Sequence, residues 1–415
     1  HFHAARSRQT EIEKPRRSHG PQSRHWRNDL DPRKTRGEIP GCESRQGRDS
    51  RREVIFGFTH RRSEFFRAPF FISIYIEGDG ESPSQIKMKI GIVGCGAIGS
   101  YYGAKLNHAG QEVHFLLRSD YDVVKRKGVF IRSPDGDFNT RPKCAKSSEE
   151  IGECDLVLIG LKATANDQFS KLLPPLVGKK TAVMTLQNGL GNEEALAKLF
   201  PIEQVLGGLC FVCLNRVEPG VIVHIGHGVV VMGEFQRYPE PRTHEIAAMF
   251  QTAGVTCKVT DNLAKAHWEK LVWNIPFNGL GVASAAGYEP FEVPGAECQV
   301  SDLLGACLTT DKLLEDPRWE KLVRELMMEV ITAAGAMGHQ IPASFADKQI
   351  ERTLTMGAYR ASTLIDFEAG RPLELGALFF EPLRQAQSAG ANVSRLERLC
   401  RVLQQLDSVQ SVTRR

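Results

Sequence analysis

The 415-residue chain lacks a hydrophobic run long enough to cross a membrane. No stretch of eighteen consecutive apolar residues occurs, although 41% of the residues are apolar. The sequence therefore predicts no membrane-spanning helix and no membrane partner. A chain of this length and apolar content is expected to fold into two domains with hydrophobic cores.

Clustered cysteines are also missing. The ten cysteines are scattered along the chain, and only Cys210 and Cys213 lie close in sequence. This pair sits inside an apolar run without a second Cys or His cluster, so both residues are expected to fill the core rather than hold a metal or form a redox pair. We expect no metal site and a reducing, cytoplasmic compartment.

The chain has no basic surplus typical of nucleic-acid binding once its N-terminal part is set aside. Residues 1–87 hold 18 of the 53 Lys and Arg residues and 12 of the 49 Asp and Glu residues. The remaining 35 basic and 37 acidic residues give residues 88–415 a net charge of −2, whereas the whole chain carries +4. This near-neutral part argues against a nucleic-acid partner.

Residues 1–87 differ from the rest of the chain in composition. They are rich in Arg, Ser, Gly and Pro, show little periodicity, and contain none of the eight methionines, the first of which is Met88. We expect this leader to be disordered or non-native and the natural chain to begin at Met88, so that deleting the leader changes neither activity nor stability. A mitochondrial transit peptide is the alternative, and the acidic residues of the leader count against it.

A glycine-rich turn directly after Met88 is the most informative feature that the sequence does have. An apolar, β-branched run leads into Gly94-Cys95-Gly96-Ala97-Ile98-Gly99, and a helix-compatible segment follows as far as Gly110. In dinucleotide-binding turns of this kind the first glycine permits the turn, the second lets a pyrophosphate touch the backbone, and the third lets the helix lie close to the strand. We expect residues 94–99 to bind a dinucleotide; a purely structural glycine turn is the alternative.

The second predicted strand, which starts at Glu112, ends without the acidic residue that binds the ribose hydroxyls of NAD. Arg118 stands at that point instead, with further basic residues at 125–127. An arginine there suits the extra phosphate of NADP, so the sequence favours NADPH over NADH. A solvated basic loop would give the same pattern.

Two further apolar runs end in polar side chains. Residues 155–161 read as a buried parallel strand that ends at Lys162, and residues 181–186 as another that ends at Gln187 and Asn188. Since open α/β sheets bind ligands at the carboxyl ends of their strands, we expect these side chains to contribute to a site rather than to be chance loop residues.

The rest of the first half is expected to consist of strands and one helix. The strands are expected near 205–212, 220–225, 229–233 and 256–260, and the helix near 243–253. Hairpin turns are expected at Pro219-Gly220 and at Gly226-His227-Gly228.

From Asn262 onward the pattern is helical, with no convincing strand. In the helix expected over 264–279, Lys270, Asn274 and Asn278 recur every four residues and so share one face, and Pro276 is expected to kink the helix. On periodicity alone, a solvated face gives the same pattern. Later helices are expected at 299–315, 317–338, 344–356, 374–389 and 393–407. A Gly-Arg-Pro turn lies within the segment from Ser362 to Glu374.

Six separated motifs, in this order, resemble the ketopantoate reductase (2-dehydropantoate 2-reductase) family from about Met88 to near the C-terminus. They are the turn at 94–99, Lys162 with its strand, Gln187-Asn188-Gly189, the hairpin at 219–228, the segment from Trp268 to Asn278, and the segment from Ser362 to Glu374. The resemblance implies an α/β fold with an N-terminal Rossmann-type, doubly wound sheet over residues 88–261 and an all-helical C-terminal domain over residues 262–415.

The resemblance also implies an activity and residue roles. The family reduces 2-dehydropantoate, a 2-oxo acid, to (R)-pantoate with NADPH in pantothenate and coenzyme A synthesis. Its general acid falls on Lys270 and the partner glutamate on Glu374, whereas Lys162 falls beside the nicotinamide. Its substrate-binding residues fall on Asn188, Asn274, Asn278 and Ser362, and Asn188 also lies beside the nicotinamide.

An ammonium suits the role assigned to Lys270, because hydride attack on a ketone builds negative charge on the carbonyl oxygen. The chain departs from the family pattern at Pro276, Gly376 and Phe380, which bears on the exact substrate more than on the reaction type. An NADP-dependent reductase of another 2-oxo or 3-hydroxy acid and a non-catalytic NADP-sensing protein are the alternatives. The sequence leaves the oligomeric state open, a homodimer included.

Overall fold

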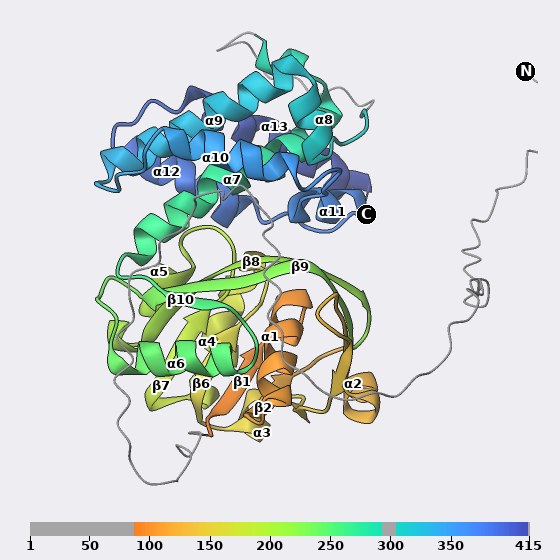
Figure 1. Cartoon of the computed structure of the whole chain (residues 1–415), viewed down its shortest axis with the longest axis vertical. Helices are drawn as coiled ribbons and strands as arrows, with labels where there is room; N and C mark the ends of the chain where they lie inside the picture. Colours follow the sequence, from red (N-terminus) through yellow and green to blue (C-terminus); the bar gives the residue numbers. More distant parts are fainter. Residues whose placement is uncertain (1–86, 293–303, 414–415) are drawn as a thin grey trace, which may run out of the picture. The chain divides into compact units, whose positions relative to one another are not determined.

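The computed structural model describes residues 87–292 and 304–413 (Figure 1). The predictions for the leader, apart from its last residue, lie outside these ranges. The same holds for the part of the predicted 299–315 helix that precedes residue 304.

The described strands form one mixed ten-stranded sheet in the order β4–β3–β9–β8–β7–β6–β1–β2–β5, with β10 paired to β9. The strands are β1 (Lys89–Val93), β2 (Glu112–Leu116), β3 (Val129–Arg132), β4 (Phe138–Thr140), β5 (Lys143–Ala145), β6 (Cys154–Ile159), β7 (Val177–Thr185), β8 (Val205–Glu218), β9 (Val221–Glu234) and β10 (Cys257–Val259). The run from β2 through β1, β6 and β7 to β8 is parallel, and β8 and β9 pair antiparallel. Consequently β1, β6 and β7 all end at the same edge of the sheet.

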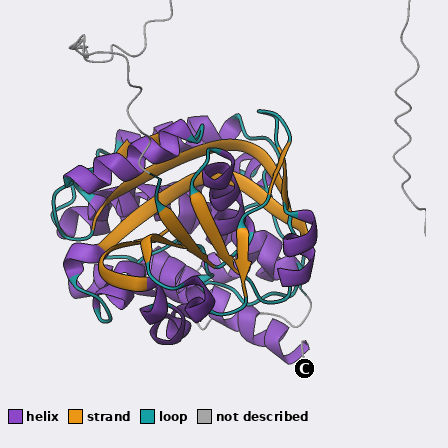
Figure 2. Ribbon diagram, turned by 90° about the horizontal axis from the view of Figure 1, so that it is seen from below, coloured by secondary structure: helices purple, strands orange, loops and turns teal. Residues whose placement is uncertain are grey.

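Helices cover both faces of this sheet. They are α1 (Ala97–His108), α2 (Tyr121–Lys127), α3 (Ser148–Ile151), α4 (Phe169–Leu172), α5 (Asn192–Ala197) and α6 (Pro241–Thr252). Because successive strand residues point to opposite faces, Leu158 of β6 packs into the core formed with α1 and α6, and Ile159 packs into the core formed with α4 and α5. In Figure 2 helices lie on both sides of the strands. The predicted doubly wound α/β sheet is confirmed.

The described residues after Val259 contain helices and loops but no strand. The helices are α7 (Leu263–Ala283), α8 (Thr310–Glu315), α9 (Pro317–Ala336), α10 (Ser344–Leu354), α11 (Ser362–Glu368), a π-helical turn (Gly376–Phe380), α12 (Glu381–Ser388) and α13 (Ser394–Thr413). The buried helix α7 packs against α9, α11 and α13, and its apolar residues contribute to a core separate from those of the sheet. The predicted helical C-terminal part is therefore confirmed as a fold class.

Two local predictions are wrong. The hairpin turn expected at Gly226-His227-Gly228 does not exist, since β9 runs through it from Val221 to Glu234. The long partner strand β8 continues to pair with β9 through this segment. The positive φ angles of His227 (63°) and Gly228 (128°) occur at a register shift in this pairing. The helix expected from 299 begins only at Thr310 among the described residues, because the backbone N–H of Leu308 bonds Gly281 and Ser284 of the preceding segment.

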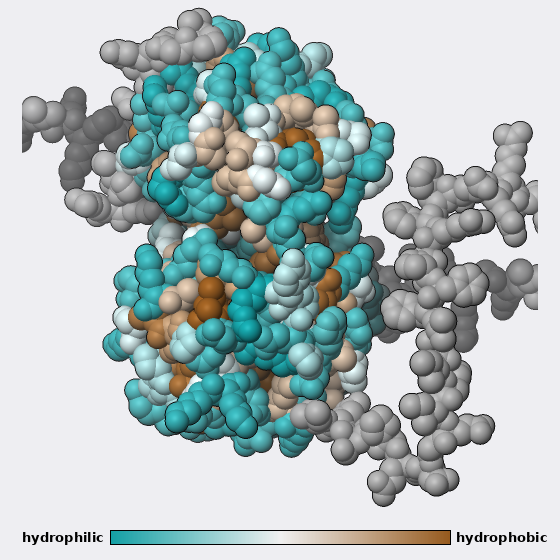
Figure 3. Space-filling view, turned by 90° about the vertical axis from the view of Figure 1, so that its left-hand side faces the viewer, coloured by the Kyte–Doolittle hydropathy of each residue, from teal (hydrophilic) through white to brown (hydrophobic). Residues whose placement is uncertain are grey.

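No helix within the described ranges is both long enough and apolar enough to span a bilayer. On the face that Figure 3 presents, hydrophilic residues predominate and hydrophobic residues form only small groups.

Candidate active site

The turn between β1 and α1 has the backbone geometry that its glycines predict. Gly94 adopts a φ of 95°, and a Cβ at Gly99 would lie 2.3 Å from the carbonyl oxygen of Gly94. A Cβ at Gly96 would instead meet no atom of the chain within 4 Å. Gly96 is also the N-cap of α1 and no side chain caps this helix end, so the backbone N–H groups of its first turn are free of a side-chain partner. An open, uncapped helix N-terminus of this kind fits a pyrophosphate.

Two residues of the turn, Cys95 and Ile98, pack against the core on one face of the sheet. Ala97 is partly buried in the first turn of α1. The Cys95 thiol approaches the carbonyl oxygens of Ile92 and Leu116, at 3.6 and 3.5 Å, and burial raises its pKa well above the ordinary value. Cys95 therefore stays a neutral thiol that ties the turn to the end of β2.

Arg118 follows β2 and is exposed. Its side chain bonds no other residue within the described ranges, so its guanidinium is available to a ligand. The nearby Asp120 is buried and accepts bonds of 3.0 and 2.6 Å from Arg216. This pairing neutralises the buried carboxylate two residues after Arg118.

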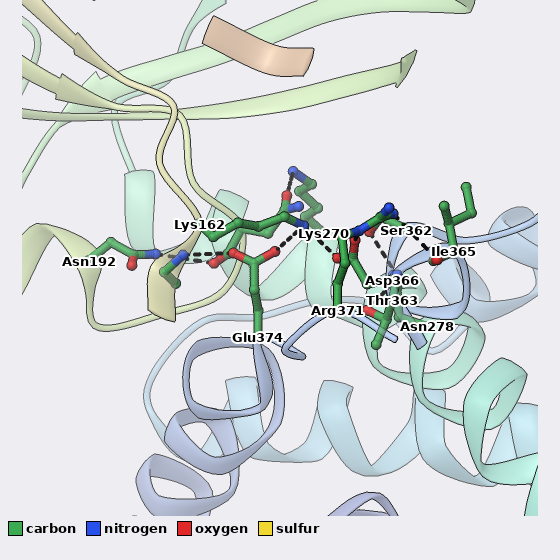
Figure 4. A network of polar contacts seen from close by, with 12 residues as sticks. Lys162, Asn192, Lys270, Asn278, Ser362, Thr363, Ile365, Asp366, Arg371 and Glu374 are labelled. Carbon is green, nitrogen blue, oxygen red and sulfur yellow. Dashed lines mark hydrogen bonds and ion pairs between the residues drawn. The ribbon is translucent and has the colours of Figure 1, made fainter. Parts of the chain in front are cut away.

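Lys162 and Glu374 meet although they come from the two halves of the chain (Figure 4). Lys162 follows β6, and its Nζ donates to Asp366 Oδ2 at 2.7 Å and to Glu374 Oε2 at 2.9 Å. The other oxygen of Glu374 accepts the backbone N–H of Ala163 at 2.7 Å. Burial opposes the charge of Lys162, but the attraction of Glu374 and Asp366 outweighs it and raises the pKa of the ammonium.

This arrangement differs from the pairing expected for Glu374. The resemblance makes Glu374 the partner of Lys270, whereas the carboxylate bonds Lys162 and the backbone of Ala163. The physical reason is that Glu374 faces the carboxyl end of β6, where both donors lie. Its negative charge still reaches Lys270, whose pKa it pulls upward.

Lys270 of α7 meets Asn188, the residue that follows β7 and Gln187. The Lys270 Nζ donates to Asn188 Oδ1 at 2.8 Å and lies 5.4 Å from the centre of the Phe211 ring. Burial lowers the pKa of Lys270 below its ordinary value of 10.5, against the opposing influence of Cys210 and Glu374. A desolvated ammonium with a lowered pKa gives up its proton more readily than an ordinary lysine.

The loop that carries Asn188 is fixed against the helical half. Gly189 adopts a φ of 89°, and a Cβ there would lie 2.3 Å from the carbonyl oxygen of Ala377. The N–H of Leu190 donates to that same oxygen at 2.9 Å. Since Ala377 lies in the π-helical turn that begins two residues after Glu374, Asn188 and Glu374 are held in one packed region.

The polar face predicted on α7 is present. The helix runs without a break through Pro276, and both Asn274 and Asn278 are buried. Asn278 Oδ1 accepts bonds from Ser362 Oγ at 3.2 Å and from the backbone N–H and hydroxyl of Thr363 at 3.1 and 3.0 Å. Asn278 and Ser362 are therefore brought together, at the first turn of α11.

Several residues that the sequence reasoning did not single out belong to this network. Asp366 bonds both Lys162 and Arg371 Nε, the latter at 2.8 Å. Asn166 and Asn192 join Gln187, which the sequence had indicated, in a chain of amides that links the segment after Lys162 to the loop of Asn188. Asp366 lies four residues after Ser362, and this helical spacing was the available signal that both serve one face of α11.

Comparison with known proteins identifies relatives over both halves of the chain. The family model for ketopantoate reductase PanE/ApbA matches residues 90–237, and the model for its C-terminal part matches residues 299–407. A 2-dehydropantoate 2-reductase from Nostoc sp. (strain PCC 7120) is 40% identical over 326 residues, which are 77% of this chain and 95% of the relative.

Solved structures agree with the sequence matches. The crystal structure of 2-dehydropantoate 2-reductase from Geobacter metallireducens is 44% identical with a TM-score of 0.70, over 76% of this chain and 99% of that one. The corresponding structure from Methylococcus capsulatus is 32% identical with a TM-score of 0.68, over 78% and 97% of the two chains.

Proposed function

Because the chain belongs to the ketopantoate reductase family of oxidoreductases, we propose that it reduces 2-dehydropantoate to (R)-pantoate with NADPH, a step of pantothenate and coenzyme A synthesis. The observation that carries the proposal is the bond between Lys270 Nζ and Asn188 Oδ1. This bond holds an ammonium of lowered pKa at the carboxyl end of β7.

Lys270 acts as the proton donor in this proposal. When bound, the reduced nicotinamide supplies the hydride. Lys270 transfers a proton from Nζ to the carbonyl oxygen as negative charge develops there, so that hydride and proton together convert the ketone to a secondary alcohol. Asn188 directs the ammonium by accepting a hydrogen bond from one of its three N–H groups, which leaves the other two N–H groups for the substrate.

The remaining side chains orient the substrate. Asn274, Asn278 and Ser362 line one side of α7 and the start of α11, and they bind the hydroxyl and carboxylate of the substrate. Their contribution is orientation rather than chemistry. Glu374 accepts a hydrogen bond from the substrate hydroxyl, and its bond to Lys162 holds the carboxylate next to the site.

The N-terminal half holds the cofactor. The open turn at Gly96 and the uncapped start of α1 bind the pyrophosphate, and Lys162 and Asn188 lie beside the nicotinamide. The exposed Arg118 binds the 2′-phosphate and so selects NADPH. Residues 88–261 then form the cofactor domain and residues 262–415 the substrate domain.

The first test follows NADPH absorbance with 2-dehydropantoate as substrate, and then with a panel of other 2-oxo acids. We expect turnover with 2-dehydropantoate to exceed that with each member of the panel. Faster turnover with another acid of the panel would identify that acid as the substrate. Tight NADPH binding without turnover of any acid would indicate a cofactor-sensing protein.

The second test replaces the proposed donor. Lys270→Ala should lower kcat by about two orders of magnitude or more, because the developing alkoxide loses its proton source. NADPH affinity, measured by the fluorescence of the bound nicotinamide, should stay nearly unchanged. Near-normal turnover in this variant would remove Lys270 from the mechanism.

A further inference from the structure

A buried carboxylate–imidazole pair lies next to the proposed donor and takes no part in the chemistry derived above. Glu193 is in the first turn of α5 and His267 in the second turn of α7, and His267 Nε2 lies 3.0 Å from Glu193 Oε1. Their side chains are 4% and 9% exposed. Among the described residues, neither side chain makes another hydrogen bond.

The pair joins the same two segments that the Lys270–Asn188 bond joins. Glu193 lies five residues after Asn188 on one segment, and His267 lies three residues before Lys270 on the other. Residues three apart on a helix point to the same side, so His267 and Lys270 reach toward the sheet from successive turns of α7. Two polar bridges, of 3.0 and 2.8 Å, therefore fix this part of α7 against residues 188–193.

Packing against α9, α11 and α13 fixes α7 as a whole, whereas the two bridges act on its first turns, which also contact β8 and β9. The bond through the stiff imidazole ring holds these turns in place more firmly than the bond through the flexible lysine stem does alone. The direction of the Lys270 ammonium depends on where these turns lie. A displacement of about 1 Å at a reacting group is enough to cost about a hundredfold in rate.

The neighbouring strand leaves room for the carboxylate. A Cβ at Gly207 of β8 would lie 2.3 Å from Glu193 Oε1, so any larger residue there would push the carboxylate away from His267.

Burying a carboxylate is costly unless it is paired, and an apolar pair of similar volume would often stabilise a fold as well or better. A buried ionisable pair at this position is thus better explained by the geometry that it imposes.

We propose that Glu193 and His267 are positioning residues, which fix the first turns of α7 against residues 188–193 and thereby hold the Lys270 ammonium on Asn188 and on the substrate. This inference rests on the proposed function, since it takes Lys270 as the proton donor. Glu193 and His267 act through Lys270 and do not touch the substrate.

The test is a double-mutant cycle between Glu193 and Lys270. Glu193→Ala should lower kcat by about 10- to 100-fold while the Kd for NADPH, measured by fluorescence, changes little. Glu193→Gln, which keeps an acceptor oxygen in place, should recover kcat to within about threefold. In the Lys270→Ala background, Glu193→Ala should lower kcat no further, because there is no ammonium left to position.

A matched control separates positioning from stability. Glu234 is also buried and paired, with Arg242, but it joins β9 to α6, and neither element carries a proposed site residue. Glu234→Ala should lower the melting temperature and leave the kcat of the folded protein unchanged.

Each other outcome has a definite meaning. If Glu193→Ala lowers kcat by the same factor with and without Lys270, or leaves kcat unchanged, the positioning role is overturned while the donor role stands. If Lys270→Ala alone retains normal turnover, the donor role itself fails. Should Glu193→Ala not fold, the double substitution Glu193→Leu with His267→Leu keeps the packing without the polar bridge, and an unchanged kcat in it overturns the inference.

Discussion

The Nζ of Lys162 lies 2.9 Å from Oε2 of Glu374, although 212 residues separate the two in the chain. The same ammonium donates to Asp366 at 2.7 Å. Glu374 and Asp366 are nearly buried, with side chains 6% and 9% exposed, so Lys162 neutralises two carboxylates that the helical half carries into contact with the sheet.

Replacing this lysine should destabilise the protein. Lys162→Met leaves Glu374 without its ammonium, whereas Asp366 keeps its bond to Arg371. Because the Lys162 side chain is 51% exposed and water screens the pair, we expect a loss of only about 1–3 kcal/mol in the free energy of unfolding, measured with urea. Lys162→Arg is the matched control and should lose less.

The pH dependence of this contribution has a defined sign. The pKa of Lys162 is raised in the folded protein, so its stabilisation is complete below the ordinary value of 10.5 and is lost as the pH rises through the raised pKa. The difference in stability between the natural chain and Lys162→Met should therefore be constant near neutral pH and shrink only above about pH 10.5. A difference that vanishes already at pH 7 would contradict this account.

The sequence predicted well those features that depend on local pattern. The strand–turn–helix at residues 89–108 follows from β-branched residues and glycines, and the shared face of Lys270, Asn274 and Asn278 follows from a spacing of four. Both are properties of one contiguous segment.

The sequence predicted poorly those features that depend on contacts between distant segments. Gly226 to Gly228 look like a turn in isolation, but pairing along β8 holds them in a strand. Similarly, nothing near Glu374 in sequence shows that Lys162, rather than Lys270, is its direct partner. Asp366 and the Glu193–His267 pair were missed for the same reason, since each gains its partner only through the fold.

Two glycines of the turn should behave oppositely when each is replaced by alanine. At Gly99 a Cβ would lie 2.3 Å from the carbonyl oxygen of Gly94, so Gly99→Ala should deform the turn and lower the melting temperature as well as NADPH affinity. At Gly96 a Cβ would meet no atom within 4 Å, and φ is −74°, so Gly96→Ala should fold normally. It should still weaken NADPH binding, because the methyl group occupies the space that the pyrophosphate needs.

Melting curves and NADPH titrations of both variants check this pair of expectations. Unchanged NADPH affinity in a folded Gly96→Ala protein would show that the turn does not receive the pyrophosphate.

Arg118 should discriminate between the two nicotinamide cofactors. Arg118→Ala should weaken NADPH binding by about 1–3 kcal/mol, the range for a charge-assisted bond, with little effect on NADH. Since the Arg118 side chain is exposed and bonds no residue within the described ranges, its loss should not alter the melting temperature. Titrations with both cofactors measure the difference, and an equal loss for both would exclude a role in reading the 2′-phosphate.

The lowered pKa of Lys270 gives opposite pH profiles for the two directions of the proposed reaction. Ketone reduction needs the protonated ammonium, so kcat should fall as the pH rises through the pKa of Lys270, which lies below the ordinary value of 10.5. Oxidation of pantoate by NADP⁺ needs the neutral amine as base, so its kcat should rise through the same pKa. Lys270→Arg is the control: arginine stays protonated, so neither limb should appear in that variant below about pH 12. A basic limb that persists in Lys270→Arg belongs to another group, and the proton donor would then have to be sought among the other titratable side chains of the site.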